Sequence, residues 1–371
     1  MQKIVQLLFP FILCVMQFSC NQDRYSELLN LDLSQIDSHS EIAISNVVQD
    51  LRYISLATKE NCLIANKFKI YVVEDYIITI ARNQIFIFDK QSGEFLRSIA
   101  GQGEGPNEYL RVSTILPVQE DIHTIFAYSN NGLIGYSYEG ENVVNVSRPK
   151  DSTCNDMLRI SSDLYAGYQF NESTKLLLFN KNGEVLRQFA NNKILDGNIF
   201  LYPNSMFYTY GHKTNFYESV NDTIFQLDLV EGCKARYHLD WGNHQIVLQE
   251  MSNPVISKQF CYPQNIYESD SLLIVQYVYQ GKNGLAICDK SNSKVMHCQN
   301  GGKLENDIDS FVPVTVASID EKQFVGYITV EDFFEWKECH SAEWMNNPKL
   351  ELFQNLNEMD NPIIVIGNYR L

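Results

Sequence analysis

Residues 101–109 read GQGEGPNEY, with three glycines on alternate positions followed by a proline and an acid. Glycine-rich loops of this kind can hold a phosphate through their backbone N–H groups. A phosphate loop also needs a Lys-Ser/Thr pair and a helix behind it, whereas here no lysine follows and the next residues, EYLRVSTILPV, favour a strand. We therefore interpret Gly101, Gly103 and Gly105 as part of a corner between two sheets. The alternative is a small anion-binding nest formed by their N–H groups.

Motifs for hydrolytic or metal chemistry are incomplete. The chain contains neither G-x-S-x-G nor H-E-x-x-H. Of its seven histidines only His238 and His244 are close in sequence, and six residues of extended strand would separate them by about 20 Å. The acidic pair Glu74 and Asp75 lies at an expected turn, where solvated acids are common. These patterns predict no catalytic residue, no metal site and no cofactor.

The first residues, MQKIVQLLFPFILCVMQFSC, have the pattern of an export signal. One cation, Lys3, precedes an apolar run at residues 4–16, and Ser19 stands directly before Cys20. The run is too short to span a bilayer comfortably. The junction of Ser19 and Cys20 resembles a bacterial lipoprotein signal, in which the cysteine is acylated and becomes the first mature residue. An ordinary cleaved signal and a free secreted protein form the alternative.

The segment after the cysteine is polar and acidic and shows little hydrophobic periodicity up to residue 45. Such a composition is typical of a tether between an anchor and a folded body. We therefore divide the chain into a signal peptide at 1–19, an acylated cysteine with a polar tether at 20–46, and one folded domain at 47–371.

The nine cysteines are scattered, and no C-x-x-C pair occurs. This spacing argues against a zinc site and against a dense disulfide framework. One bridge, between Cys288 and Cys298 on adjacent expected strands, is compatible with an oxidising compartment. Buried free thiols are the favoured state for most of the others.

Composition narrows the class of protein. The 371 residues include 29 Lys plus Arg against 45 Asp plus Glu, which gives a formal net charge of −16. A field of this sign repels phosphate backbones, so we expect no nucleic-acid partner. With 21 Tyr, 21 Phe and 45% hydrophobic residues, the chain can bury a large core and favours strands.

Short runs rich in Val, Ile, Tyr and Phe follow one another from residue 47 onward, each bounded by Asn, Asp, Gly or Ser. Four such runs within 68–99 predict a four-stranded antiparallel meander. Units of strand and polar turn recur at roughly 40 to 60 residues, the period of four-stranded propeller blades. The sequence therefore predicts six blades, at 68–99, 111–147, 156–190, 198–240, 262–298 and 311–370.

The two ends of the chain supply the strands that would close the ring. Residues 50–57 (DLRYISLA) have no blade of their own, and pairing them with the C-terminal run PIIVIGNYRL would remove two open sheet edges. A helical stretch near residues 331–358 interrupts the last blade and carries several aromatic residues. We expect its apolar face to pack on its own domain, and a partner-binding surface is the alternative.

The order FDKQSGEFLRSIAGQGEGPNEYLRV resembles the first blade of the six-bladed β-propeller lipoproteins abundant in Bacteroidetes. It holds a strand, a D-x-x-x-G turn, a second strand and a G-x-G-x-G-P-x-E-aromatic corner. The chain end DNPIIVIGNYRL is similar to the closing strand of the same family, and one departure is Asn107, where the family often has Gly. The resemblance implies an all-β, six-bladed β-propeller of four-stranded antiparallel blades, lipidated at Cys20, and it implies no common activity.

Three tripeptides resemble the Asp-Ser/Thr-apolar signal for O-glycosylation of exported Bacteroidetes proteins. They place candidate acceptors at Ser152, Thr223 and Ser271. All three are expected in loops, as such a modification requires. Chance occurrence of so short a pattern is the alternative.

These features favour a lipoprotein of the cell envelope, anchored in the lipid bilayer of the outer membrane by palmitate and other acyl chains on Cys20, and facing either the periplasm or the cell exterior. Because no catalytic motif is complete, we expect a non-catalytic binding or scaffold module for a protein, peptide or glycan ligand at the mouth of the propeller channel. The alternative is a propeller enzyme of the lactonase or glycan-lyase type, with a metal or carboxylate site on the axis.

Overall fold

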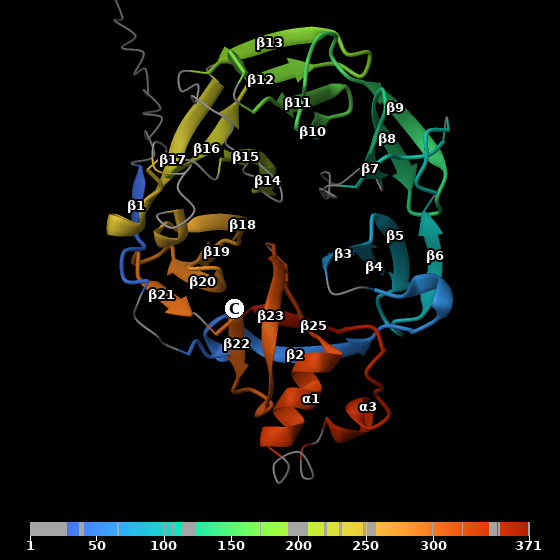
Figure 1. The fold of residues 1–371 in the computed structure, drawn as a ribbon, viewed down its shortest axis with the longest axis vertical. Coiled ribbons are helices and arrows are strands. Elements are labelled where there is room, and N and C mark those ends of the chain that lie inside the picture. Colours follow the sequence, from blue (N-terminus) through green and yellow to red (C-terminus); the bar gives the residue numbers. More distant parts are fainter. Residues whose placement is uncertain are drawn as a thin grey trace, which may run out of the picture.

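Six small sheets stand in a ring around a central axis (Figure 1). This arrangement is a six-bladed β-propeller, and it confirms the fold predicted from the sequence. The structure is a computed structural model that describes residues 28–369 except 37–40, 65–66, 100, 106, 113–123, 171, 192–206, 219–220, 230–231, 248–249, 251–256, 299, 321, 341–346 and 348. The export signal and Cys20 therefore lie outside the described residues.

Three blades are four-stranded antiparallel meanders with the predicted limits. Blade 1 is formed by β3 (Phe68–Val73), β4 (Tyr76–Ala81), β5 (Gln84–Asp89) and β6 (Phe95–Ile99). Blade 3 is formed by β10 (Asp156–Ser161), β11 (Leu164–Tyr168), β12 (Thr174–Phe179) and β13 (Val185–Ala190). Blade 5 is formed by β18 (Tyr262–Glu268), β19 (Leu272–Tyr279), β20 (Lys282–Asp289) and β21 (Val295–Cys298). Successive residues of a strand point to opposite faces, so Ile77 packs toward blade 6 and Ile78 toward blade 2.

Blades 2 and 4 depart from the four-stranded pattern. Among the described residues blade 2 has β7 (Thr124–Ser129), β8 (Gly132–Ser137) and β9 (Asn142–Ser147), while most of its predicted first strand lies outside them. Blade 4 has β14 (Phe207–Tyr210), β15 (Lys213–Tyr217), β16 (Thr223–Asp228) and β17 (Gly232–Asp240). A fifth strand, β1 (Leu29–Asp32), runs parallel to β17 at the outer edge. Blade 4 therefore has one strand more than predicted.

Blade 6 joins an early strand, β2, to the last described strand, β25. Its strands are β22 (Lys303–Asn306), β23 (Phe311–Ile319), β24 (Phe324–Ile328), β25 (Ile363–Tyr369) and β2 (Val48–Ser55). β2 pairs with β25 in antiparallel register, so the predicted closure of the ring is confirmed. Gly93, in the last turn of blade 1, has φ +75°, and a Cβ there would stand 2.0 Å from the backbone oxygen of Ser55. Only glycine lets this turn approach the closing strand.

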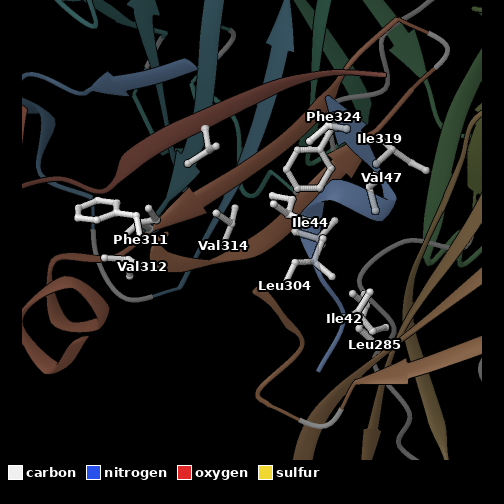
Figure 2. Close-up of a cluster of buried hydrophobic side chains, with 14 of the residues drawn as sticks. Ile42, Ile44, Val47, Leu285, Leu304, Phe311, Val312, Val314, Ile319 and Phe324 are labelled. Atoms are coloured by element: carbon white, nitrogen blue, oxygen red, sulfur yellow. The ribbon is translucent and has the colours of Figure 1, made fainter. Parts of the chain in front are cut away.

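The N-terminal segment does not behave as a tether from residue 29 onward. Leu31 and Leu33 are fully buried between blades 4 and 5, and the Leu33 N–H donates to the Asp240 oxygen at 2.7 Å. Further along, Ile42 and Ile44 are buried beside blades 5 and 6 (Figure 2). We call the described part of residues 29–47 the N-terminal strap. It differs from the predicted tether because its apolar residues find partners far along the chain, which local periodicity does not reveal.

The described residues between β24 and β25 include two helices, α1 (Val330–Cys339) and α3 (Leu350–Phe353). Phe333 and Phe353 are buried against Phe311 of β23, with the rings of Phe311 and Phe353 4.7 Å apart between centroids. The aromatic face of this helical insertion thus packs on its own blade, as expected. Short 3-10 helices are η1 (Ile44–Asn46), η2 (Glu60–Cys62), η3 (Gly242–His244) and η5 (Ser257–Gln259). No described helix combines the length and the apolar content needed to cross a bilayer.

Candidate functional site

The glycine-rich loop at 101–109 forms a corner in which the carboxylate of Glu108 accepts a backbone N–H of the loop. The N–H of Gly105 donates to Oε2 of Glu108 at 2.9 Å, and the N–H of Gly103 donates to the Tyr109 oxygen at 3.0 Å. A Cβ on Gly103 would lie 2.0 Å from the same carboxylate oxygen. Tyr109 is fully buried between blades 1 and 2. Gly101, Gly103 and Gly105 do not line the central cavity described below.

The three candidate glycosylation residues have different surroundings. The hydroxyl of Ser152 is half-buried and donates to the Pro149 oxygen at 2.7 Å. Thr223 is the first residue of β16 rather than a loop residue, and its hydroxyl donates to Oδ1 of Asp222 at 2.8 Å. Ser271 is exposed in the bend between β18 and β19. The loop prediction is therefore wrong for Thr223, whose strand begins one residue earlier than the turn pattern indicates.

The histidines and cysteines singled out by the sequence are not brought together. His238 lies on β17, where its Nδ1 is 2.5 Å from Oδ1 of Asn30, while His244 lies in η3. Cys288 and Cys298 are both free thiols on opposite faces of blade 5, because Cys288 packs toward blade 4 and Cys298 toward blade 6. The suggested bridge between them is therefore wrong. Within the described ranges, no three His, Cys, Asp or Glu side chains gather closely enough to hold a metal ion.

A central cavity of about 690 Å³ lies between strands of four blades, β3, β14, β18 and β23. Its wall combines aromatic, amide and charged side chains, among them Lys69, Tyr71, Asn265, Tyr267 and Tyr327. The volume is within the range of sites for small ligands, and such sites combine apolar surface with a few polar groups. None of these residues belongs to a motif recognisable in the sequence.

An amide brace ties blades 5 and 6 together in the cavity wall. Nε2 of Gln276 donates to the Val316 oxygen at 2.8 Å, while Oε1 accepts from Nδ2 of Asn265 at 2.8 Å and from the Tyr267 hydroxyl at 3.2 Å. Burial raises the pKa of Tyr267, so its hydroxyl stays protonated. The brace fixes the direction of these polar groups around the cavity.

One buried carboxylate, that of Glu268, joins blades 4 and 5 at the cavity wall. Arg236 donates to both of its oxygens at 2.8 and 2.7 Å, and Nζ of Lys290 donates to Oε1 at 2.9 Å. The hydroxyls of Tyr237 and Tyr208 donate at 2.7 and 3.1 Å. Both oxygens of Glu268 are engaged, which suits a carboxylate that holds structure rather than one that exchanges protons with a substrate.

Tyrosine and carboxylate also meet across two other blade interfaces. The Tyr128 hydroxyl of blade 2 donates to Oδ1 of Asp156 in blade 3 at 2.6 Å. The Tyr168 hydroxyl of blade 3 donates to Oε1 of Glu218 in blade 4 at 2.9 Å, and burial together with Glu218 raises the pKa of Tyr168. These contacts join residues from different repeats, so a reading of each repeat alone does not find them.

Three cations stand at one end of blade 1, beside the cavity. Phe68 of β3 pairs with Ala81 of β4; Lys67 immediately precedes β3, and Arg82, with φ +49°, follows β4 in the turn to β5. Lys69 lies within β3, and all three cations line the cavity. Burial lowers the pKa of Lys69 to about 8, against the opposing influence of Asp156. The only sequence signal for this group is the alternation in KFKIYVV.

The ring of six sheets and its axial cavity place this chain among the six-bladed β-propellers. It belongs to DUF4934, a family of domains of unknown function whose model matches residues 28–368. The match begins just before β1, so the N-terminal strap is part of the family domain. No curated protein matches the sequence.

Solved structures show the same fold at low sequence identity. One is a Bacteroides fragilis protein for which export is proposed. It is 18% identical to this chain, with a TM-score of 0.70, and the superposition covers 93% of this chain and 100% of the other. Another is a member of the DUF4221 family from Bacteroides vulgatus. It is 12% identical to this chain, with a TM-score of 0.53, and the superposition covers 87% of this chain and 97% of the other. At these identities the similarity extends to the fold alone.

Proposed function

We propose that the chain is a cell-envelope propeller that binds a small polar ligand in its central cavity without transforming it. The observation that carries this proposal is the cavity of about 690 Å³, whose wall brings tyrosines, amides and charged groups from four blades to one space. The strands that present these groups are braced by buried hydrogen bonds, which favours a preformed site.

Binding is favoured over catalysis by the state of the acids in the wall. Glu268 has both oxygens bonded to Arg236, Lys290 and two tyrosines. Oδ1 of Asp320 accepts the N–H groups of the next turn, at 2.7 Å from Lys322 and 2.8 Å from Gln323. An axial hydrolase or lyase would need a carboxylate or metal able to reach the substrate.

The proposal also includes export of the chain and a lipid anchor at Cys20. The signal-like start and Cys20 support a lipid anchor, with the outer membrane as its site. The structural similarity to a Bacteroides fragilis protein for which export is proposed supports the same compartment. Metabolic labelling with a palmitate analogue tests the anchor: the wild type should carry the label and Cys20→Ser should lose it. An unlabelled wild-type protein would refute lipidation.

The binding proposal is tested by filling the cavity. Thr209 lines it from β14, and Thr209→Trp should reduce the affinity for any ligand bound there by roughly tenfold or more. Leu186→Trp is the matched control, because Leu186 is 61% exposed on an outer strand. Calorimetric titration with neutral and acidic oligosaccharides and short peptides gives the measurement. Binding that Thr209→Trp leaves unchanged, or no binding of any probe by folded protein, would refute the proposal.

A further inference from the structure

The cation group on blade 1 has a geometry that a bound anion would stabilise. Phe68 and Ala81 are directly paired, so Lys67 just before β3 and Arg82 in the turn after β4 flank the same end of this strand pair. Like charges gathered at one end of a strand pair repel one another, and a bound anion would offset that repulsion. Lys69 of β3 adds a third positive charge. All three residues line the central cavity.

The acids of the same region only partly offset these charges. Asp156 of blade 3 acts on Lys69, while its Oδ1 also accepts the Tyr128 hydroxyl. Glu268 is already shared by two cations of its own. Among the described residues the wall holds Lys67, Lys69 and Arg82 against the acids Glu268 and Asp320, a small positive excess in a chain whose formal net charge is −16. Such local reversal of charge concentrates anions at that site.

The remaining wall suits a polyhydroxylated ligand. Gln264, Asn265 and Asn283 bring amide groups to the cavity from blade 5, and Tyr71 and Tyr327 bring aromatic rings. Amides both donate and accept hydrogen bonds, as sugar hydroxyls do. β3, β14 and β18 are edge strands of their sheets, so each has one side with unpaired backbone N–H and C=O groups. These groups are further hydrogen-bond donors and acceptors.

We propose that the central cavity binds an acidic oligosaccharide, with a carboxylate of the sugar held by Lys67 and Arg82 and the neutral part of the sugar lying against the amides and tyrosines. This inference rests on the proposed binding function and specifies its ligand class. A cavity of about 690 Å³ accommodates a ligand of a few sugar units rather than a folded protein. Charge-assisted bonds from Arg to a carboxylate are among the strongest polar contacts.

The test is calorimetric titration of the full chain in detergent with three probes: tri-galacturonate, the neutral maltotriose and the peptide tri-glutamate. We expect tri-galacturonate to bind most tightly, and its affinity to fall as salt is raised from low to physiological concentration. Lys67→Met with Arg82→Met should weaken it by roughly tenfold or more. The matched control is Lys181→Met with Lys213→Met, two exposed lysines outside the cavity, which should leave the affinity unchanged.

The outcomes separate this inference from the broader function. If maltotriose binds as well as tri-galacturonate, and Thr209→Trp abolishes both, the cavity is a binding site but the acidic assignment is wrong. Preference for tri-glutamate would overturn the sugar assignment in favour of a peptide. If the variant at Lys67 and Arg82 has an unchanged melting temperature and still binds tri-galacturonate normally, the cation group is not the contact. Absence of binding by all three probes would overturn the inference as well.

Discussion

Glu108 occupies the glycine-rich corner in the manner of a bound anion, because its carboxylate accepts the N–H of Gly105. The feature that most resembled a ligand loop in the sequence is therefore satisfied from within the chain. Its role is to carry the backbone from blade 1 to blade 2 while Tyr109 fills the space between them. The residues that face the cavity lie elsewhere, on strands without a recognisable motif.

The corner can be tested with two small substitutions. Gly103→Ala places a Cβ 2.0 Å from Oε2 of Glu108, and Glu108→Ala removes that carboxylate. Each should lower the free energy of unfolding by about 1–3 kcal/mol, and the double variant should lose much less than the sum. Gly101→Ala is the control, because its added Cβ meets no atom within 4 Å. Additive losses measured by urea unfolding would contradict this account.

The Glu268 network predicts a large loss of stability from a change that conserves shape. Glu268→Gln leaves Arg236 and Lys290 without their shared counterion, and the side chain of Glu268 is 0% exposed. Removal of one partner from a buried ion pair costs about 3–5 kcal/mol. Glu94→Gln, which removes a surface pair with Lys59, should change stability by less than about 0.5 kcal/mol. Similar effects of both substitutions would show that the network contributes little.

His297 predicts a pH dependence at the acid side. Burial lowers its folded-state pKa to about 4 from an ordinary value of 6.5, and Asp32 opposes that shift. The unfolded chain therefore takes up the proton first, so stability falls as pH decreases from about 6.5 to 4. His297→Gln should reduce the slope of unfolding free energy against pH in this window. An identical slope in the two proteins would exclude His297 as the source.

At the scale of elements, the N-terminal strap is a structural part of the propeller. Leu33 is fully buried between blades 4 and 5, so Leu33→Ala should cost about 2–5 kcal/mol. Leu28→Ala is the matched control, because Leu28 is 49% exposed. A segment that served only as a tether would make the two variants equivalent in thermal unfolding. The expected difference therefore separates a strap from a tether.

The same elements show which features of the fold can be predicted from local sequence patterns. Alternating apolar residues and self-bonding Asp turns, such as Asp89 with Ser92, define a blade within some thirty residues, so the sequence predicts most blade limits correctly. β1 pairs with β17 about 200 residues away, and its short apolar pattern is surrounded by acids. The cavity wall is likewise assembled from four blades. Chemistry that depends on such distant contacts has no signature in any single repeat.

At the scale of the whole molecule, ring closure has a consequence for folding kinetics. β2 pairs with β25, and beside this pair the Asn361 N–H donates to Oγ1 of Thr58 across a separation of 303 residues. Contacts between residues so far apart form slowly, because the entropy of closing a long loop must be overcome first. The ring cannot close before β25 has been synthesised. Blades 1 to 5 would assemble while two sheet edges are still open, and the pairing of β25 with β2 would end the period in which the chain is prone to aggregation.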